Sequence, residues 1–94
     1  MIQSFKDDNT AALFFEGKNR RWASIASVAG RKLDMINAAA SLNDLRAPPG
    51  NRLEALVVGD RKGQHSIRIN DQYRICLVWR EDGVHEVEIT DYHS

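Results

Sequence analysis

The sequence predicts an α+β fold, in which two N-terminal helices pack on a four- to five-stranded, mainly antiparallel sheet. From Trp22 to Ala40, apolar residues recur every three or four positions, as in an amphipathic helix; after "APPG" at 47–50 they alternate with polar residues. Short polar segments, "GDRKG", "NDQ" and "EDG", separate the alternating stretches and are typical of turns between antiparallel strands. The 94 residues are expected to form one domain, residues 1–94.

Two helices are expected in the first half, after a short strand-like start from Ile2 to Phe5. In "DDNTAALFFEG", Asp and Asn caps, helix-forming alanines and a Gly17 stop predict a helix of about three turns. A second, amphipathic helix is predicted by the spacing of the following apolar residues: Trp22, Ala26, Ala29, Leu33, Ile36 and Ala40.

Four strands are expected in the second half, in "NRLEALVV", "GQHSIRIN", "QYRICLVWR" and "VHEVEIT". A two-residue loop between the second and third strands would mix apolar and polar faces. A three-residue loop, "NDQ" at 70–72, instead pairs Ile67 with Ile75 and Arg68 with Arg74. Continued across "EDG", the same alternation gives three further pairs: Leu77 with Val87, Ile75 with Ile89, and Arg74 with Thr90.

This register places two arginines opposite each other on the polar face of the sheet. Facing like charges are destabilising, so we expect either a bound anion between Arg68 and Arg74 or nearby carboxylates, such as Glu88, that pair with them. Alternation assigns three further residues to this face: Arg52, Glu54 and Tyr92. Asp91 and His93 alternate to the opposite side, unless the strand becomes irregular at its end.

Composition excludes several classes of protein. Thirteen basic and thirteen acidic residues cancel, which argues against a simple polycation that coats nucleic acid. Residues 46–74 nevertheless carry six basic and three acidic groups. The sequence lacks an apolar run of bilayer length and a signal peptide, so a cytoplasmic protein without membrane contact is expected. The single Cys76 cannot form an internal disulfide, and neither a metal nor another cofactor is indicated.

The polar face has the groups that metal-independent phosphodiester cleavage needs. A base must take the proton of the attacking 2′-hydroxyl, cations must neutralise the phosphorane, and an acid must protonate the leaving 5′-oxygen. Here, "GQHSIRINDQYRICLVW" and the closing "ITDYH" resemble the HigB toxins of the RelE superfamily, and the resemblance runs from "MIQSF" to His93. It implies the RelE-like fold, mRNA cleavage in the ribosomal A site, and neutralisation by a HigA-like helix-turn-helix antitoxin. Contact with DNA would then be only indirect, through the antitoxin complex.

The resemblance also implies which residues act. Arg68 and Arg74 match its two arginines, and Asp91, Tyr92 and His93 match its terminal Asp-Tyr-His. We expect Glu54 or Asp91 to remove the 2′-proton, His93 to protonate the leaving oxygen, and Tyr92 to stack on a base. The candidates for RNA binding are basic: Arg52, Arg61, Lys62, Lys18, Arg20 and Arg21. The last three could instead be only solvated.

Two departures from the family pattern weaken the expected activity. Many members carry a histidine in Lys-Leu-His-Pro-Leu, where this chain has Glu54 in "RLEAL". A lysine usual before Gly-Asp is also absent, since Val57 and Val58 precede Gly59. His65 replaces an aromatic residue and is expected to be structural, on the apolar face. Slow cleavage is therefore expected, and two alternatives stay open: a ParE-like gyrase poison, or a non-catalytic module that binds RNA or protein.

Overall fold

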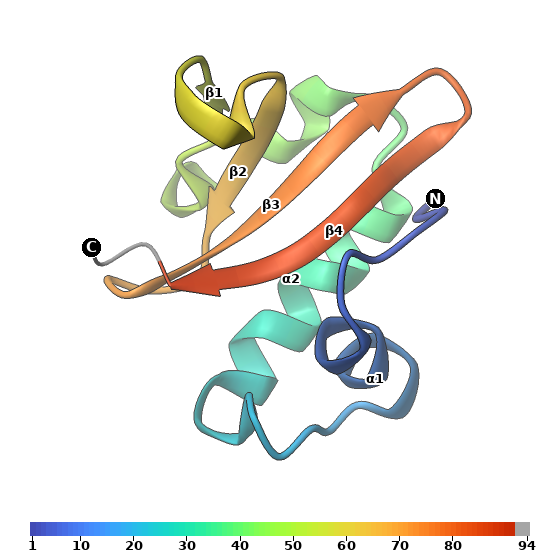
Figure 1. Ribbon diagram of the computed structural model, residues 1–94, viewed down its shortest axis with the longest axis vertical. Coiled ribbons are helices and arrows are strands. Elements are labelled where there is room, and N and C mark those ends of the chain that lie inside the picture. Colours follow the sequence, from blue (N-terminus) through green and yellow to red (C-terminus); the bar gives the residue numbers. More distant parts are fainter. Residues whose placement is uncertain (92–94) are drawn as a thin grey trace.

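The helices and strands follow the predicted order in the computed structural model, which describes residues 1–91 (Figure 1). The α-helices are α1 (Asp8–Glu16) and α2 (Ala26–Ala38), and the strands are β1 (Glu54–Leu56), β2 (Gln64–Arg68), β3 (Tyr73–Arg80) and β4 (Gly83–Asp91). Short 3-10 helices lie in the connections: η1 (Ala23–Ile25), η2 (Leu42–Arg46), η3 (Pro49–Asn51) and η4 (Gly59–Arg61).

Helix α1 has the predicted caps. The Asp7 carboxylate accepts a hydrogen bond from the Thr10 backbone N–H at 3.0 Å, and Gly17 ends the helix in the left-handed conformation, with φ of 75°. The buried Thr10 hydroxyl also accepts a hydrogen bond from the Ile89 backbone N–H at 3.1 Å. The first turn of α1 is thereby fixed to the end of β4.

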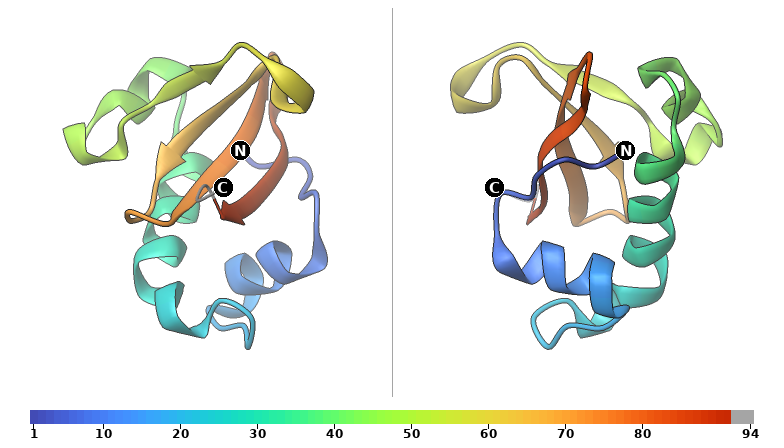
Figure 2. Two further views of the ribbon diagram at one scale, coloured as in Figure 1. Left: turned by 60° about the vertical axis from the view of Figure 1, so that its left-hand side comes forward. Right: turned by 90° about the vertical axis from the view of Figure 1, so that its right-hand side faces the viewer.

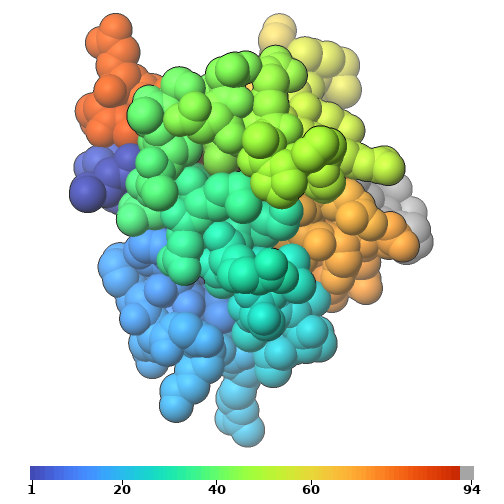
Figure 3. All heavy atoms as spheres, turned by 180° about the vertical axis from the view of Figure 1, so that it is seen from behind, coloured from blue at the N-terminus to red at the C-terminus, as the bar shows by residue number. Residues whose placement is uncertain are grey.

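The core lies between the two helices and one face of the sheet (Figure 2). Leu13 of α1 and Leu33 and Ile36 of α2 are fully buried with Ile67 and Ile75 of β2 and β3. Figure 3 shows the molecule from behind, where α2 and the segment that follows it cover the middle and upper part of this side. The predicted packing of two helices on an antiparallel sheet is confirmed.

The four strands are antiparallel in the order β1-β2-β3-β4. The predicted register is confirmed for four pairs: Ile67 with Ile75, Arg68 with Arg74, Ile75 with Ile89, and Arg74 with Thr90. The predicted pair of Leu77 with Val87 is not part of the regular ladder between β3 and β4, because the register shifts between Cys76 and Val78. Glu86, with φ of 52°, lies in this irregular part of β4.

The N-terminal segment runs beside β4 (Figure 2). It makes two isolated parallel bridges, between Ile2 and Val84 and between Phe5 and Val87, in place of a full fifth strand. Neither α-helix, nor any other helix within residues 1–91, is long and apolar enough to cross a bilayer.

Candidate active site on the outer face of the sheet

The sheet face opposite the helices carries the polar side chains of all four strands, and we call it the outer face. The register aligns four of them in one row: Glu54, Ser66, Cys76 and Glu88. The adjacent row contains Arg68, Arg74 and Thr90. The alternation of apolar and polar residues therefore brings carboxylates and guanidiniums from distant parts of the chain onto one surface.

Arg74 lies at the centre of this face and is largely buried, with 8% of its side chain exposed. Its Nε donates a hydrogen bond to the Ser66 hydroxyl at 2.8 Å, and a terminal nitrogen donates to the Arg52 carbonyl at 2.7 Å. The same nitrogen lies 3.8 Å from the Glu54 carboxylate. Arg74 thus ties β3 to β2 and to the start of β1, and it places a positive charge beside Glu54.

Glu54 is half exposed, so its carboxylate can reach a substrate. The segment before it is held by the buried Asn51, whose amide donates to the carbonyls of Leu45 and Ala47 and whose oxygen accepts from the Lys32 ammonium. Burial lowers the pKa of Lys32. Arg52 follows in the left-handed conformation, with φ of 46°, and its carbonyl accepts a hydrogen bond from Arg74.

Arg68 faces Arg74 across the strands, as predicted, but each arginine has protein partners. The Arg68 guanidinium bonds to the Asp71 carboxylate in the β2–β3 turn, whereas Arg74 is satisfied by Ser66, Arg52 and the nearby Glu54. A bound anion is therefore not needed to hold them together. Since the Asp71 side chain is 99% exposed, solvent screens its pair with Arg68, which therefore adds little to stability.

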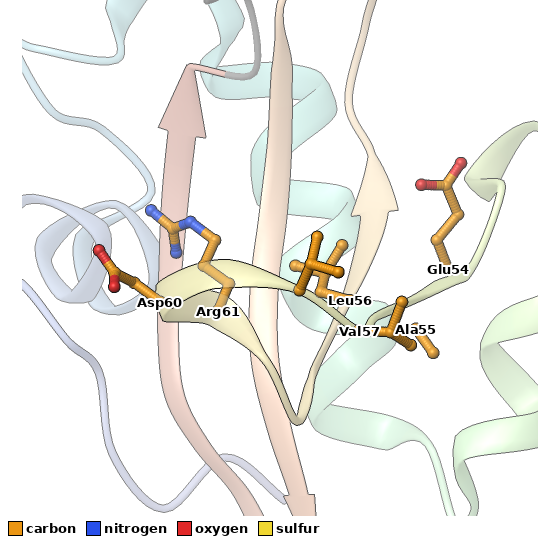
Figure 4. Close-up of a pocket in the computed structure, with 7 residues that line it drawn as sticks. Glu54, Ala55, Leu56, Val57, Asp60 and Arg61 are labelled. Atoms are coloured by element: carbon orange, nitrogen blue, oxygen red, sulfur yellow. The ribbon is translucent and has the colours of Figure 1, made fainter.

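The loop between β1 and β2 (residues 57–63) crosses the outer face and brings Arg61 over β4 (Figure 4). The Arg61 guanidinium bonds to the Glu88 carboxylate and donates to the Thr90 hydroxyl at 3.3 Å. A pocket of about 470 Å³ is lined by β1 and this loop, and Glu54 and Arg61 are among its residues. Val57 and Val58 also line this pocket, and their side chains are exposed to solvent.

The hydrogen bond to Glu88 raises the pKa of Arg61, so this guanidinium stays positively charged. Beside it, Cys76 is fully buried, and burial raises the pKa of its thiol. The Cys76 thiol is therefore expected to be unreactive in the folded protein, where it only fills space beside Arg61. Residues 1–91 contain no group of three or more His, Cys, Asp or Glu side chains that could hold a metal ion.

The other predicted residues lie elsewhere. Lys18, Arg20 and Arg21 are exposed in the connection between α1 and α2, away from the outer face, and Lys62 is exposed in the β1–β2 loop. Asp91 pairs with Tyr73, whose ring packs on Trp22 on the helix side of the sheet. His65 is half-buried between Ala55 and Leu77 in the register, and its Nδ1 has no hydrogen-bond partner in the described part of the chain. Tyr92 and His93 lie outside the described residues.

Sequence reasoning did not find that Arg61 pairs with Glu88, or that Ser66 and Asn51 hold the site together. Arg61 and Glu88 are 27 positions apart in the sequence, and no local pattern predicts a contact between them. The alternation in β4 indicated only that Glu88 lies on the same face of the sheet as Thr90 and Arg74. Asn51 follows "APPG", where a polar residue normally indicates an exposed turn.

Comparison with known proteins identifies the family. Residues 3–93 match the family model described as the RelE-like toxin of the type II toxin-antitoxin system HigB. Toxin HigB-1 of Vibrio cholerae serotype O1 is 43% identical over 86 residues, which cover 89% of this chain and 88% of that protein. An uncharacterized protein of Haemophilus influenzae is 39% identical over 80 residues, covering 83% of this chain and 76% of that one.

A solved structure shares the fold. The chain superposes on one from a YoeB-YefM complex of Staphylococcus aureus with a TM-score of 0.60 and 15% identity, covering 100% of this chain and 99% of that chain. At this identity, the likeness supports the arrangement of two helices on an antiparallel sheet.

Proposed function

Because this chain belongs to the HigB family of RelE-like type II toxins, we propose that it is a metal-independent endoribonuclease that cuts messenger RNA on the ribosome and thereby inhibits translation. One observation carries the proposal: an exposed carboxylate, Glu54, lies 3.8 Å from a buried guanidinium, Arg74, on a face that also presents Arg68 and Arg61.

Glu54 acts as the general base. It accepts the proton of a ribose 2′-hydroxyl while the 2′-oxygen attacks the adjacent phosphorus and the bond to the 5′-oxygen breaks. The Arg74 guanidinium, 3.8 Å away, orients the Glu54 carboxylate. A carboxylate accepts a proton less readily than a histidine at neutral pH, so the reaction is slow.

Arg68 and Arg61 bind the phosphate. Each is paired with a carboxylate in the free protein, Asp71 and Glu88 respectively, so each is already desolvated in part and oriented. Arg68 releases the exposed Asp71 and binds the phosphate instead. Its positive charge then stabilises the negative charge that develops on the phosphorane. Arg61 lines the same pocket as Glu54 and holds the RNA backbone.

The remaining roles fall on the C-terminal residues. We assign to His93 the proton that the leaving 5′-oxygen needs, and to Tyr92 the stacking of a base, as the family resemblance implies. The products are then a 2′,3′-cyclic phosphate and a free 5′-hydroxyl.

Control of the activity comes from a neighbouring antitoxin, since the family is that of type II toxin-antitoxin systems. We propose a HigA-like helix-turn-helix protein, which would bring this chain to DNA only within the complex. The other partners are the ribosome and its mRNA.

A cell-free translation system tests the function. The expected result is arrest of translation together with mRNA that is cut only when ribosomes are present. Intact mRNA with gyrase-dependent DNA breaks would show a gyrase poison instead. If translation continues and both nucleic acids stay intact, the protein is a non-catalytic binder.

A further inference from the structure

A carboxylate on the outer face is held by two cations from different parts of the chain. Glu88 of β4 bonds to the guanidinium of Arg61 in the β1–β2 loop, and its Oε1 also lies 4.0 Å from the Lys6 ammonium. The Glu88 side chain is 16% exposed, whereas those of Arg61 and Lys6 are 34% and 47% exposed. The acid is therefore the least exposed of the three, and both bases can be reached from solvent.

The position of neither base depends on Glu88 alone. Lys6 ends the N-terminal segment, and its backbone N–H donates to the Val87 carbonyl at 3.0 Å, which places it beside Glu88. The β1–β2 loop carries Arg61 over β4 (Figure 4), where the guanidinium also donates to the Thr90 hydroxyl at 3.3 Å. We call the four residues with these side-chain contacts the Glu88 cluster: Lys6, Arg61, Glu88 and Thr90.

The groups of the Glu88 cluster suit a phosphate. Arginine binds carboxylate and phosphate oxygens with the same fork of N–H donors, so a phosphate can take the place that the Glu88 carboxylate occupies. The Thr90 hydroxyl accepts a bond from Arg61, and a hydroxyl that accepts can still donate its own proton. Asp60, the other carboxylate of the loop, is exposed, so solvent screens its charge. Two cations and a hydroxyl would thus face the phosphate.

The Glu88 cluster adjoins the centre of the proposed active site. Cys76 pairs with Glu88 in the register of β3 and β4. Burial raises the pKa of the Cys76 thiol, and the charges of three cations act in the opposite direction: Arg61, Arg74 and Lys6. These cations therefore lie around the same buried thiol and form one continuous positive surface. An RNA backbone bound at Arg74 can reach the Glu88 cluster without leaving the outer face.

Distance decides which phosphate the Glu88 cluster can hold. Glu54 and Glu88 lie in one row of the sheet, three strand spacings of ~4.8 Å apart, which is roughly 14 Å. One phosphate cannot contact both the proposed general base and Lys6 across that distance. The Glu88 cluster is therefore suited to a phosphate further along the RNA than the one that is cleaved.

We propose that Lys6, Arg61 and Thr90 form a second phosphate site, which binds a backbone phosphate of the RNA near the scissile one. In the free protein the Glu88 carboxylate occupies this site, so it competes with the RNA. This inference rests on the proposed function for its ligand, and it specifies which part of the RNA backbone Arg61 holds. Lys6 binds RNA but takes no part in the chemical step.

The test measures the binding of a 2′-O-methyl RNA hexamer, which lacks the attacking hydroxyl and is not cut by this mechanism. Fluorescence anisotropy gives the affinity at low salt and its salt dependence. Glu88→Gln should bind at least about threefold more tightly than the original protein, because a competing negative charge is gone. Lys6→Gln should bind about threefold more weakly, with a slope of log affinity against log salt smaller by about 0.7, as expected for one lost phosphate contact.

Two matched controls each remove one charge elsewhere: Glu86→Gln on β4, which removes the partner of Arg80, and Arg31→Gln on α2. Both should bind the hexamer as the original protein does. If the Glu88 pair were only structural, Glu88→Gln would bind no more tightly than Glu86→Gln, and that result would overturn the proposal. So would a Lys6→Gln protein that binds as well as Arg31→Gln, or an original protein that does not bind at all.

Lys6 is exposed, so Lys6→Gln decides the matter even if Glu88→Gln does not fold. The same variants are then assayed for mRNA cleavage on ribosomes. Cleavage by the original protein without these changes in hexamer binding rejects only the second phosphate site. The expected changes in binding without cleavage by the original protein reject only the nuclease.

Discussion

Arg74 serves both the fold and the site. Its guanidinium satisfies the Ser66 hydroxyl and the Arg52 carbonyl, and its charge lies beside Glu54. Sequence pattern could place this residue on the outer face and opposite Arg68, but it could not show that the guanidinium is buried. A substitution of Arg74 is therefore expected to affect the fold as well as the site.

Arg74→Ala should reduce both stability and cleavage. Its loss leaves buried partners without hydrogen bonds, at a cost of about 1–3 kcal/mol in the free energy of unfolding, and cleavage should fall more than about tenfold. Urea denaturation and a ribosome cleavage assay measure the two effects. Arg74→Lys keeps the charge but lacks the guanidinium fork, so it should recover only part of each. A fully stable Arg74→Ala protein would contradict the hydrogen-bonding role.

Glu54 and Asp91 show what alternation along a strand can predict at the level of residues. Because successive side chains of a strand point to opposite faces, Glu54 was correctly expected beside the arginines and Asp91 on the other side. The same logic failed for Arg52, since its left-handed backbone takes it out of the strand. A left-handed residue of this kind cannot be recognised from the pattern of apolar and polar residues.

Among the elements, the β1–β2 loop is the one that closes the site. The loop buries Cys76 beneath Arg61, and the Arg61–Glu88 pair fastens it to β4. Because its contacts join residues far apart in the sequence, the segment could be predicted only as the turn "GDRKG" between two strands.

Glu88→Gln should loosen this loop. Losing a half-buried ion pair lowers the free energy of opening by ~1 kcal/mol, so Cys76 should react with a thiol reagent about fivefold faster. Glu86→Gln, which removes the Arg80 pair at 3.8 Å elsewhere on β4, is the matched control and should leave the rate unchanged. Equal rates in both variants would show that Glu88 does not hold the loop.

The 3-10 helix η2 has a titratable cap that supports the segment before β1. The Asp44 carboxylate accepts hydrogen bonds from the backbone N–H groups of Ser41 and Ala40, and these, the Ser41 bond foremost, lower the pKa of Asp44. A pKa lowered by folding means that the ionised form stabilises the fold. This stabilisation is complete above the ordinary value of 3.8 and is lost as the pH falls below it.

Asp44→Asn should therefore lower the melting temperature at pH 7, and the difference from the original protein should shrink below about pH 3.8. Thermal unfolding followed by circular dichroism between pH 2.5 and 7 (roughly the range over which carboxylates titrate) measures this. Asp34→Asn should show no such dependence. A difference that is constant across the range would mean that the charge of Asp44 plays no part.

For the whole molecule, fold class, strand order and most of the register were predictable from sequence, because they follow from hydrophobic period and turn chemistry. The shift between Cys76 and Val78 and the path of the β1–β2 loop were not, since both depend on tertiary contacts. The outer face nevertheless brings Glu54 of β1, Arg61 of the β1–β2 loop and Arg68 of β2 onto the same surface as Arg74 of β3. This convergence is what a phosphodiester-cleaving site requires.

The most direct test is single-turnover cleavage of mRNA on programmed ribosomes by the original protein and three variants. We expect Glu54→Gln to be slower by about 10²-fold and Arg68→Ala by more than about tenfold, whereas Arg31→Ala, which removes an exposed charge on α2, cuts at the original rate. Cleavage by Glu54→Gln at the original rate, or intact mRNA with the original protein, would contradict the assignment of the outer face as the active site.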